Sequence, residues 1–294
     1  MEFSNPELHG RALFEILGKL RSIDKQLSAS HSINVERYLS QLFNIPRYSN
    51  PRRLLKYGWK GLSQFDEDGI LQEIFKRIGV KTKTAIEIGA GSGNENNTLY
   101  LLNSGWRCLW VESDASRAGA LRKKFYGLKN LCVKNLAALP DNVNEISIPG
   151  VDELDLWTLD IDGNDYWVFE QFDPAVSRPR VIVLEYNAKY RPPIEWAMPF
   201  NPNHKFDKSD YMGASLQSLT RLCNKKGYSL VGCGVTGANA YFVRNDLLEN
   251  HFLAPFSPEN HYEPGRYWLS RGYYVGMDPG QLGLNALVEK NIEV

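Results

Sequence analysis

The sequence predicts an α/β fold with a mostly parallel sheet, and three features support this prediction. Short apolar runs alternate with helical patterns between residues 63 and 227, the order expected of a sheet covered by helices. A glycine-rich turn follows the first run directly. Two later runs enclose a Gly/Asn turn, which predicts a final antiparallel hairpin. The predicted strands cover residues 85–88, 108–111, 131–134, 154–160, 181–186, 228–233 and 240–243.

The first 60 residues are predicted to form a helical extension and a linker. Apolar residues recur at helical spacing between residues 6 and 28, and a second helical pattern covers residues 35–43 before Pro46. We expect these helices to pack against the core or a partner subunit, which makes the chain a candidate homo-oligomer. The basic, aromatic link over residues 47–60 could bind an acidic group, although a solvated connector is the simpler interpretation.

A helix is expected before the first strand, with an apolar stripe from Ile70 to Ile78 and Gly79 at its end. This position brings Gln64 and Asp68 near the edge of a cofactor cleft. N-terminal capping by Asp66 or Asp68 is the alternative explanation for the acids in its first turn. Further helices are expected from residue 99, over residues 115–125 and 166–172, and from Ser215 to Gly227.

The segment T-A-I-E-I-G-A-G-S-G-N-E-N-N-T, residues 84–98, predicts a strand, a tight turn and a helix start. Its glycines, Gly89, Gly91 and Gly93, allow positive φ and close approach of a ligand, and a helix N-terminus offers free N–H groups. Glu87 would repel a pyrophosphate and suits a cationic ligand such as the sulfonium and ammonium of S-adenosylmethionine. A glycine turn alone also fits other Rossmann-like sites.

Two residues after the next strands are expected to contact a nucleoside. Glu112 ends the second strand, where an acid can accept hydrogen bonds from both ribose hydroxyls of NAD or S-adenosylmethionine. Asp114 is expected to cap the helix that follows. Asn135 follows the third strand and is expected at the adenine edge.

The fourth and fifth strands end in acids. Asp160, Asp162 and Asp165 surround Gly163 in D-I-D-G-N-D. Capping of the following helix is the alternative role for one of these three acids. Glu185 and Asn187 follow on the fifth strand, so these side chains converge at adjacent strand ends. Carboxylates and an amide oxygen suit Mg²⁺ or a similar ion, and we assign Asp160, Asp162, Glu185 and Asn187 as candidate ligands. Direct cofactor contact, for which Asp160 is also a candidate, or loop capping is the alternative.

Residues 189–212 form a polar, proline-rich stretch without helical or strand period, which predicts a loop over the active edge of the sheet. His204 is the histidine of this loop and a candidate general base, alongside Asp160 and Asp162 as catalytic acids or bases. A solvated loop histidine is the alternative.

Composition bounds the function. With 294 residues, 43% hydrophobic and 23% charged, the chain is ordinary globular material with one main domain. A net charge of zero gives no reason to expect nucleic acid. The four cysteines stand apart and predict buried free thiols. No leader or membrane-spanning run is recognisable, so we expect a cytoplasmic, soluble protein with no membrane partner.

Four segments resemble FkbM-type methyltransferases: S-Q-F-D-E-D-G-I-L, E-I-G-A-G-S-G-N-E-N-N-T, L-W-V-E-S-D and D-L-W-T-L-D-I-D-G-N-D-Y-W-V. The resemblance covers residues 63 to 245. It implies a Rossmann-like class I S-adenosylmethionine-dependent methyltransferase, with O-methylation of sugars or secondary metabolites. Asp162 and Thr158 depart from the family, where glutamate and lysine are common.

We therefore expect an extension and linker over residues 1–60, a methyltransferase domain over 61–250, and a tail over 251–294 that packs on the domain or a partner subunit. The cofactor set is Gln64, Glu87, Gly89, Gly91, Gly93, Glu112, Asn135 and Asp160. The expected reaction is methyl transfer to a small-molecule hydroxyl, with metal assistance by analogy with catechol-type enzymes. An NAD-dependent oxidoreductase and a non-catalytic methyltransferase-like scaffold are the alternatives.

Overall fold

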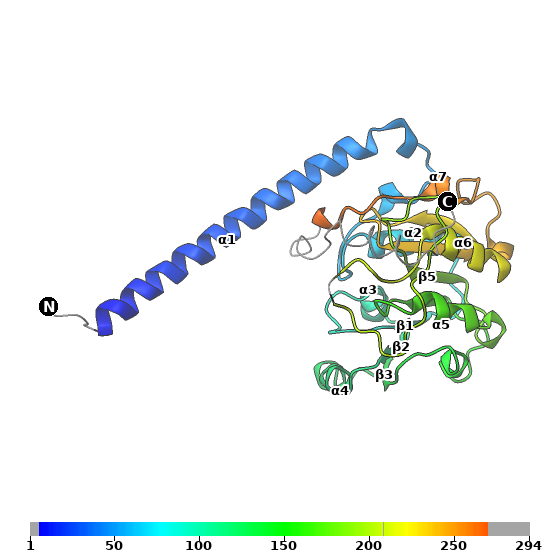
Figure 1. The fold of residues 1–294 in the computed structure, drawn as a ribbon, viewed down its shortest axis with the longest axis horizontal. Helices are drawn as coiled ribbons and strands as arrows, with labels where there is room; N and C mark the ends of the chain where they lie inside the picture. The colour runs from blue at the N-terminus through cyan, green and yellow to red at the C-terminus, as the bar shows by residue number, and fades with distance from the viewer. Residues whose placement is uncertain (1–5, 208, 270–294) are drawn as a thin grey trace. The chain divides into compact units, whose positions relative to one another are not determined.

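The computed structural model describes residues 6–207 and 209–269, and the chain divides into two compact units, Met1–Ser49 and Asn50–Val294. The first unit contains one uninterrupted helix, α1 (Pro6–Phe43), so the prediction of two separate helices was wrong (Figure 1). Residues 29–34 contain no proline or glycine. Ser28 and Ser32 each donate a hydroxyl hydrogen bond to the carbonyl four residues earlier, which accommodates these serines within the helix.

The second unit is built on a seven-stranded sheet of order β3-β2-β1-β4-β5-β7-β6. The first five strands run parallel to one another, and β7 joins β5 and β6 in antiparallel fashion. The predicted α/β fold, with a mostly parallel sheet and a final antiparallel hairpin, is confirmed. The strands are β1 (Thr84–Ile88), β2 (Arg107–Glu112), β3 (Leu131–Asn135), β4 (Leu156–Leu159), β5 (Val181–Glu185), β6 (Tyr228–Cys233) and β7 (Asn239–Arg244).

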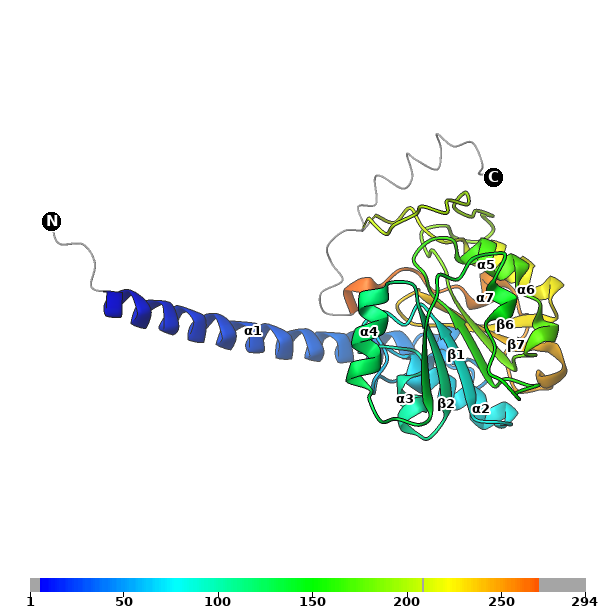
Figure 2. The ribbon, with the colours of Figure 1, turned by 90° about the horizontal axis from the view of Figure 1, so that it is seen from below.

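Helices cover both faces of this sheet (Figure 2). The helices are α2 (Glu67–Ile78), α3 (Leu99–Asn103), α4 (Ala115–Lys124), α5 (Asp165–Gln171), α6 (Leu216–Lys225) and α7 (Pro258–His261). Short 3-10 turns occupy Pro46–Tyr48, Leu55–Tyr57, Val143–Glu145, Pro174–Val176, Asn245–Leu247 and Tyr267–Leu269.

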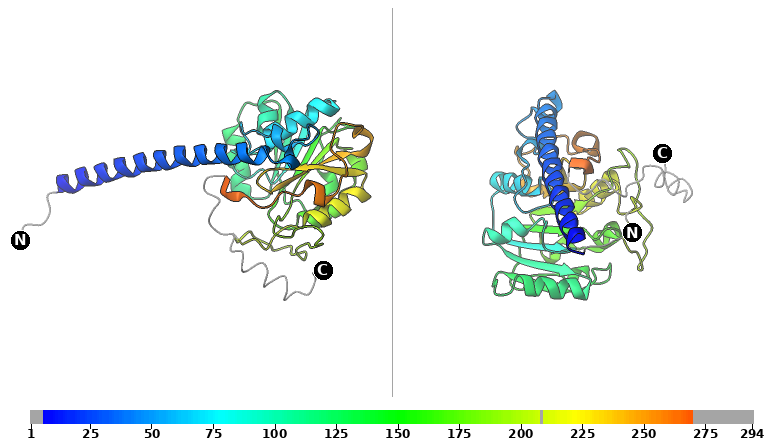
Figure 3. Two further views of the ribbon diagram at one scale, coloured as in Figure 1. Left: turned by 90° about the horizontal axis from the view of Figure 1, so that it is seen from above. Right: turned by 90° about the vertical axis from the view of Figure 1, so that its left-hand side faces the viewer.

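The two faces have separate apolar cores. α2, α3 and α4 pack on one side, where Ile70, Leu101 and Leu121 join alternate residues of β1 and β2. α5 and α6 pack on the other side through Val168 and Leu219. In the left view of Figure 3 the cyan and yellow helices accordingly lie on opposite sides of the strands. A strand covered on both faces needs apolar residues throughout, which explains the continuous apolar run of β5.

The strand order places a topological switch point between β1 and β4. From β1 the chain adds β2 and β3 on one side, then crosses to β4 and β5 on the other. In open parallel sheets, ligands bind where this reversal leaves a crevice at the carboxyl ends of the strands. The glycine turn follows β1 and the D-I-D-G segment follows β4, so the fold brings both motifs to this point.

Residues 251–269 contact the main domain. The Arg53 guanidinium donates to the backbone carbonyl and side-chain Oδ1 of Asn260, each at 2.8 Å. The hydroxyl of buried Tyr186 donates to the Glu263 carbonyl at 2.6 Å. The part of the predicted tail beyond residue 269 lies outside the described residues.

All four cysteines are free thiols. Cys108, Cys223 and Cys233 are buried as expected, but Cys132 is exposed because it lies on β3, an edge strand. The prediction of burial was therefore wrong for Cys132. Within the described residues, no helix combines the length and the apolar character that crossing a bilayer requires.

Candidate functional site

The glycine turn is anchored to β2 and pressed against β4. The N–H groups of Gly89 and Ala90 both donate to the Val111 carbonyl, at 2.9 and 3.1 Å. Gly89 has φ +95°, and a Cβ at this position would lie 1.6 Å from the Asp160 carbonyl oxygen. Only glycine fits this close crossing. Gly91 and Gly93 also have positive φ, at +54° and +67°.

Glu87 makes hydrogen bonds within the fold that the sequence did not predict. It is buried, and its carboxylate accepts hydrogen bonds from the Asn97 N–H (2.9 Å), the Thr98 N–H (3.1 Å) and the Thr98 hydroxyl. Burial raises the pKa of Glu87 to about 6, against the lowering effect of these hydrogen bonds. The carboxylate fixes the loop that leads into α3, and the expectation that Glu87 also faces a cationic ligand stays a prediction.

Glu112 closes the turn from the β2 side. One oxygen accepts the Gly91 N–H and the other accepts the Asp114 N–H, each at 2.8 Å. Asp114 in turn accepts the Arg117 N–H at 2.8 Å, so the predicted cap of α4 is confirmed. Each carboxylate oxygen of Glu112 has a second lone pair, which leaves acceptor capacity for ribose hydroxyls. The ribose assignment stays a prediction.

Three carboxylates meet beside the turn. Oxygens of Asp160, Asp162 and Glu185 all lie within 4.8 Å of one another, and the three residues are half-buried. Asp162 has φ +55°, unusual for a residue with a side chain. Asp165 does not join the group, because its carboxylate accepts the N–H groups of Ile161 (2.8 Å) and Gly163 (2.9 Å).

Burial and mutual repulsion make this group a strong acceptor of positive charge. Burial raises the pKa of Asp160 well above its ordinary value, and the neighbouring charge of Asp162 raises it further. Burial also raises the pKa of Glu185 well above its ordinary value, and repulsion from Asp160 is the second cause. In the described part of the chain, Glu185 Oε2 is buried and has no hydrogen-bond partner. A proton, a metal ion or an organic cation would relieve this repulsion.

The carboxylates line a cavity of about 230 Å³ at the switch point. Its lining consists of Gln64, Gly89, Asp160, Asp162, Glu185, Phe206, Met212, Thr236, Ala238 and Tyr267. Five of the predicted site residues therefore come together here. Phe206 and Met212 belong to the loop predicted over the active edge of the sheet. Sequence reasoning missed Thr236, Ala238 and Tyr267, of which Tyr267 lies in the assigned tail. The aromatic cluster at Tyr262, Tyr267 and Trp268 was the available signal for it.

Gln64 lies at the cleft as predicted, but the nearby acids serve other contacts. Asp68 Oδ2 accepts the N–H groups of Gly61, Leu62 and Ser63, at 2.6 to 2.9 Å. Asp66 stands at the N-cap position of α2, yet its side chain accepts the distant Val235 N–H at 2.8 Å instead. The capping interpretation was wrong, because both acids connect α2 to other segments.

His204 lies beside the carboxylates without lining the cavity. Its Nε2 is 2.9 Å from the Asp162 carbonyl oxygen. The ring sits over Gly163, where a Cβ would come within 2.3 Å of the imidazole. Burial, followed by repulsion from Asp165, raises the pKa of Asp162 despite the lowering effect of the neighbouring His204 and Arg117 side chains. Its role as a general base stays a prediction.

The two candidate asparagines are engaged elsewhere. The Asn187 amide nitrogen donates to the carbonyls of Asp210 (2.7 Å) and Met212 (3.0 Å), and its oxygen accepts the Lys189 N–H at 3.1 Å. Asn187 therefore holds the 189–212 loop, and this geometry does not support it as a metal ligand. The Asn135 amide donates to the carbonyls of Glu112 and Ser113, each at 2.9 Å.

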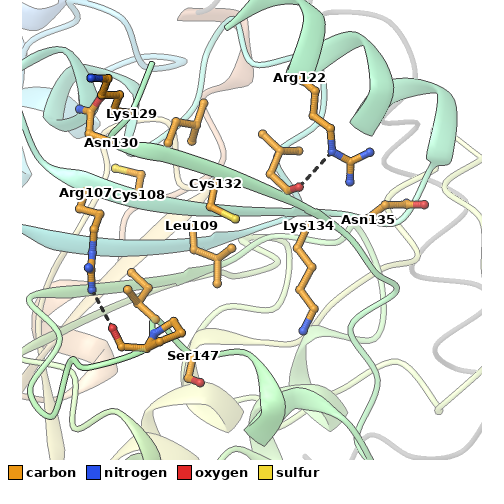
Figure 4. Close-up of a pocket in the computed structure, with 14 residues that line it drawn as sticks. Arg107, Cys108, Leu109, Arg122, Lys129, Asn130, Cys132, Lys134, Asn135 and Ser147 are labelled. Carbon is orange, nitrogen blue, oxygen red and sulfur yellow. Dashed lines mark hydrogen bonds between the residues drawn. The ribbon is translucent and has the colours of Figure 1, made fainter. Parts of the chain in front are cut away.

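Asn135 also lines a second, larger cavity of about 560 Å³ at the β3 edge of the sheet (Figure 4). Of the residues that the structure describes, four cationic side chains and no acid line this cavity. The cations are Arg107, Arg122, Lys129 and Lys134. The other predicted site residues lie outside its lining, so its size alone does not make it the candidate site.

No protein-family model and no curated protein sequence matches the chain. Similar solved structures include the O-methyltransferase TomG from Streptomyces achromogenes, at 16% identity over 62% of this chain and 82% of that chain, with a TM-score of 0.38. A SAM-dependent methyltransferase from Aquifex aeolicus is 14% identical over 58% and 87%, with a TM-score of 0.35. The glycopeptide N-methyltransferase MtfA is 13% identical over 61% and 90%, with a TM-score of 0.39.

All three TM-scores lie below 0.5 and all three identities below 25%. These likenesses therefore assign neither a substrate nor a reaction to this chain. The resemblance to FkbM-type methyltransferases stays a prediction.

Proposed function

We propose that this protein is an S-adenosylmethionine-dependent methyltransferase that methylates a hydroxyl group of a small sugar or natural product. One observation carries the proposal: the glycine turn after β1 shares a cavity at the switch point with the carboxylates that follow β4 and end β5. Among the described residues, that cavity has three carboxylates and no cationic side chain in its lining.

The charge of this cavity favours the proposed donor over a dinucleotide. S-adenosylmethionine carries a sulfonium and an ammonium, which three neighbouring carboxylates attract. The pyrophosphate of NAD would meet the same carboxylates next to Gly89 and be repelled. Glu112 beside Gly91 supplies the acceptor that the ribose of either cofactor needs, so it does not discriminate between them.

In the proposed reaction, the main task of the protein is to orient the methyl donor and the acceptor hydroxyl. The acceptor oxygen displaces the thioether at a methyl carbon that the sulfonium already activates, so S-adenosylhomocysteine leaves as a neutral sulfide. The hydroxyl proton passes to a carboxylate of Asp160, Asp162 or Glu185. Because burial raises the pKa of all three, each is a better base than an exposed carboxylate.

The same carboxylates are the residues that would hold a divalent metal ion. Hard oxygen ligands suit Mg²⁺, and the unpartnered Glu185 Oε2 fits such an ion. A bound ion would lower the pKa of the acceptor hydroxyl. The proposal of metal assistance rests on Asp160, Asp162 and Glu185 without Asn187.

Isothermal titration with S-adenosylmethionine and S-adenosylhomocysteine, with Mg²⁺ and separately with a chelator, tests this proposal. We expect micromolar binding of both compounds. A metal-dependent change that Glu185→Gln abolishes would support the metal site, and an unchanged titration would remove it. No binding under any condition would overturn the methyltransferase and leave a scaffold or another nucleotide ligand.

A matched pair of variants tests the ribose contact. Glu112→Gln should weaken donor binding roughly 10- to 100-fold, because one charged acceptor beside the turn is lost. Asp114→Asn should leave binding unchanged, since asparagine also caps helices. Equal affinity of Glu112→Gln and the unaltered chain would contradict the assignment. Formation of S-adenosylhomocysteine with a mixture of hydroxylated sugars would separate an enzyme from a scaffold.

A further inference from the structure

The helix α1 carries a stripe of large apolar side chains. Leu13, Ile16, Leu20, Ile23 and Leu27 follow one another at intervals of three, four, three and four residues, and we call these five residues the α1 seam. Their exposed fractions are between 51% and 63%. Residues at this spacing lie along one side of a helix.

Polar or small residues occupy most of the helix surface away from the α1 seam, and Phe14, which is 77% exposed, is the large apolar exception. The polar and small residues are Glu15, Gly18, Arg21, Ser22 and Lys25. A helix with one apolar side gains most of its stability in proteins by burying that side. A contiguous apolar stripe of this length marks an interaction surface.

We propose that α1 associates with α1 of other copies of this chain in a parallel, four-stranded coiled coil. In heptad notation the α1 seam has leucine at every a position, 13, 20 and 27, and isoleucine at the d positions 16 and 23. Leucine at a with isoleucine at d favours more than two strands. Leu17 at the neighbouring e position is also exposed, and it widens the apolar surface as a four-stranded packing requires.

Opposite charges on neighbouring helices support the parallel orientation, and polar residues in the heptad positions after Leu27 mark where the coiled coil ends. Lys19 occupies a g position and Asp24 the following e position, which face each other between chains in a parallel coil and have opposite charges. The next d and a positions hold Ser30 and Asn34, so the α1 seam ends at Leu27. Because it spans only residues 13–27, association should depend on concentration.

Light scattering after size-exclusion chromatography of the full chain, over a concentration series, tests the proposal. The four-chain mass is expected at high concentration. Leu20→Glu places charges in the core and should yield the one-chain mass, whereas Ser22→Glu adds the same charge outside the seam and should retain the four-chain mass. Circular dichroism checks that both variants keep their helix content.

Several outcomes would overturn the proposal. A one-chain mass for the unaltered protein at every concentration would assign the seam to another protein or to another segment of the same chain. A stable two-chain mass would overturn the four-stranded arrangement. An unchanged mass for Leu20→Glu would show that the copies associate through a different surface.

Disulfide cross-linking tests the orientation. In a Cys132→Ser background, which removes the exposed thiol, Leu27→Cys should oxidise to a reducible covalent dimer, because a parallel coil brings position 27 of two copies together. Ser22→Cys in the same background should give little cross-linking. Four-chain assembly without cross-linking at position 27 would overturn the parallel arrangement. None of these results depends on methyl transfer, so they test self-association separately.

Discussion

At the scale of single residues, Glu87 has structural contacts that the sequence did not predict. Its carboxylate accepts two backbone N–H groups and one hydroxyl, and the Thr98 hydroxyl oxygen in turn accepts the Trp110 indole N–H at 2.7 Å. These contacts join β1, the loop before α3 and β2 in one buried network. Residue type and position in the motif identified the acid, but only burial revealed its partners.

Glu87→Ala should lower the free energy of unfolding by about 3 kcal/mol, because three buried donors lose their acceptor. Urea unfolding of the variant measures this loss. Glu95→Ala is the matched control in the same loop, since Glu95 forms an exposed pair with Lys60 at 2.8 Å and its removal should cost less than about 1 kcal/mol. Equal stability of the two variants would contradict the assigned network.

The stability loss in Glu87→Ala should also depend on pH. The pKa of Glu87 is about 6 in the folded chain, above its ordinary value of 4.5, so the folded state holds the proton more tightly. This contribution to stability is present below about pH 4.5 and is lost as pH rises through 6. The loss caused by Glu87→Ala should therefore be larger at pH 5 than at pH 7, by about 1 kcal/mol. The opposite order would mean that the folded pKa is lowered.

At the scale of elements, the site depends on how closely the end of β1 approaches the end of β4. The Asp160 N–H donates to the Ile88 carbonyl at 3.0 Å, and Gly89 then passes beneath the Asp160 carbonyl. The turn and the carboxylate segment are therefore one structural unit, although about 70 residues separate them along the chain.

Two glycine substitutions separate the effect of this contact from that of backbone conformation. Gly91→Ala should cost about 1 kcal/mol, since its φ is positive but the space around it is open. Gly89→Ala should cost at least about 3 kcal/mol, because its Cβ would overlap the Asp160 carbonyl. Thermal unfolding of both variants measures the difference. Similar costs would mean that positive φ alone requires the glycine at position 89.

At the scale of the whole molecule, the lining of the cavity comes from segments spread along the chain between Gln64 and Tyr267. The C-terminal part reaches it through a buried ion pair, in which the Arg266 guanidinium lies 2.9 Å from the Glu263 carboxylate and also donates to the Val235 carbonyl at 2.9 Å. Val235 directly precedes Thr236, which lines the cavity. This pair thus joins the β6–β7 loop to the segment that contains Tyr267.

Arg266→Ala should destabilise the protein by about 3 to 5 kcal/mol, because it leaves the buried Glu263 charge uncompensated. Donor affinity should fall with it, as Thr236 and Tyr267 lose their support. Urea unfolding and donor titration measure both effects. Arg221→Ala is the control: it breaks an exposed pair with Glu195 and should cost less than about 1 kcal/mol. A cost for Arg266→Ala no larger than for this control would contradict the role of the buried pair.

The sequence by itself determined the strands, their order along the chain, the glycine turn and the acids at the strand ends. These features depend on local chemistry: apolar runs, glycine conformation and capping residues act over a few positions. The meeting of Asp160, Asp162 and Glu185 was also predictable, because parallel strands end at one edge of a sheet.

Only the tertiary structure decided which polar atoms face the cavity and which are used inside the fold. Glu87 and Asn187 carry the expected groups, but nearby backbone donors and acceptors occupy them. Phe206, Thr236 and Tyr267 reach the cavity through loop paths without periodic pattern. The physical reason is that hydrogen bonds and burial depend on contacts between segments far apart in the chain, which local sequence patterns do not encode.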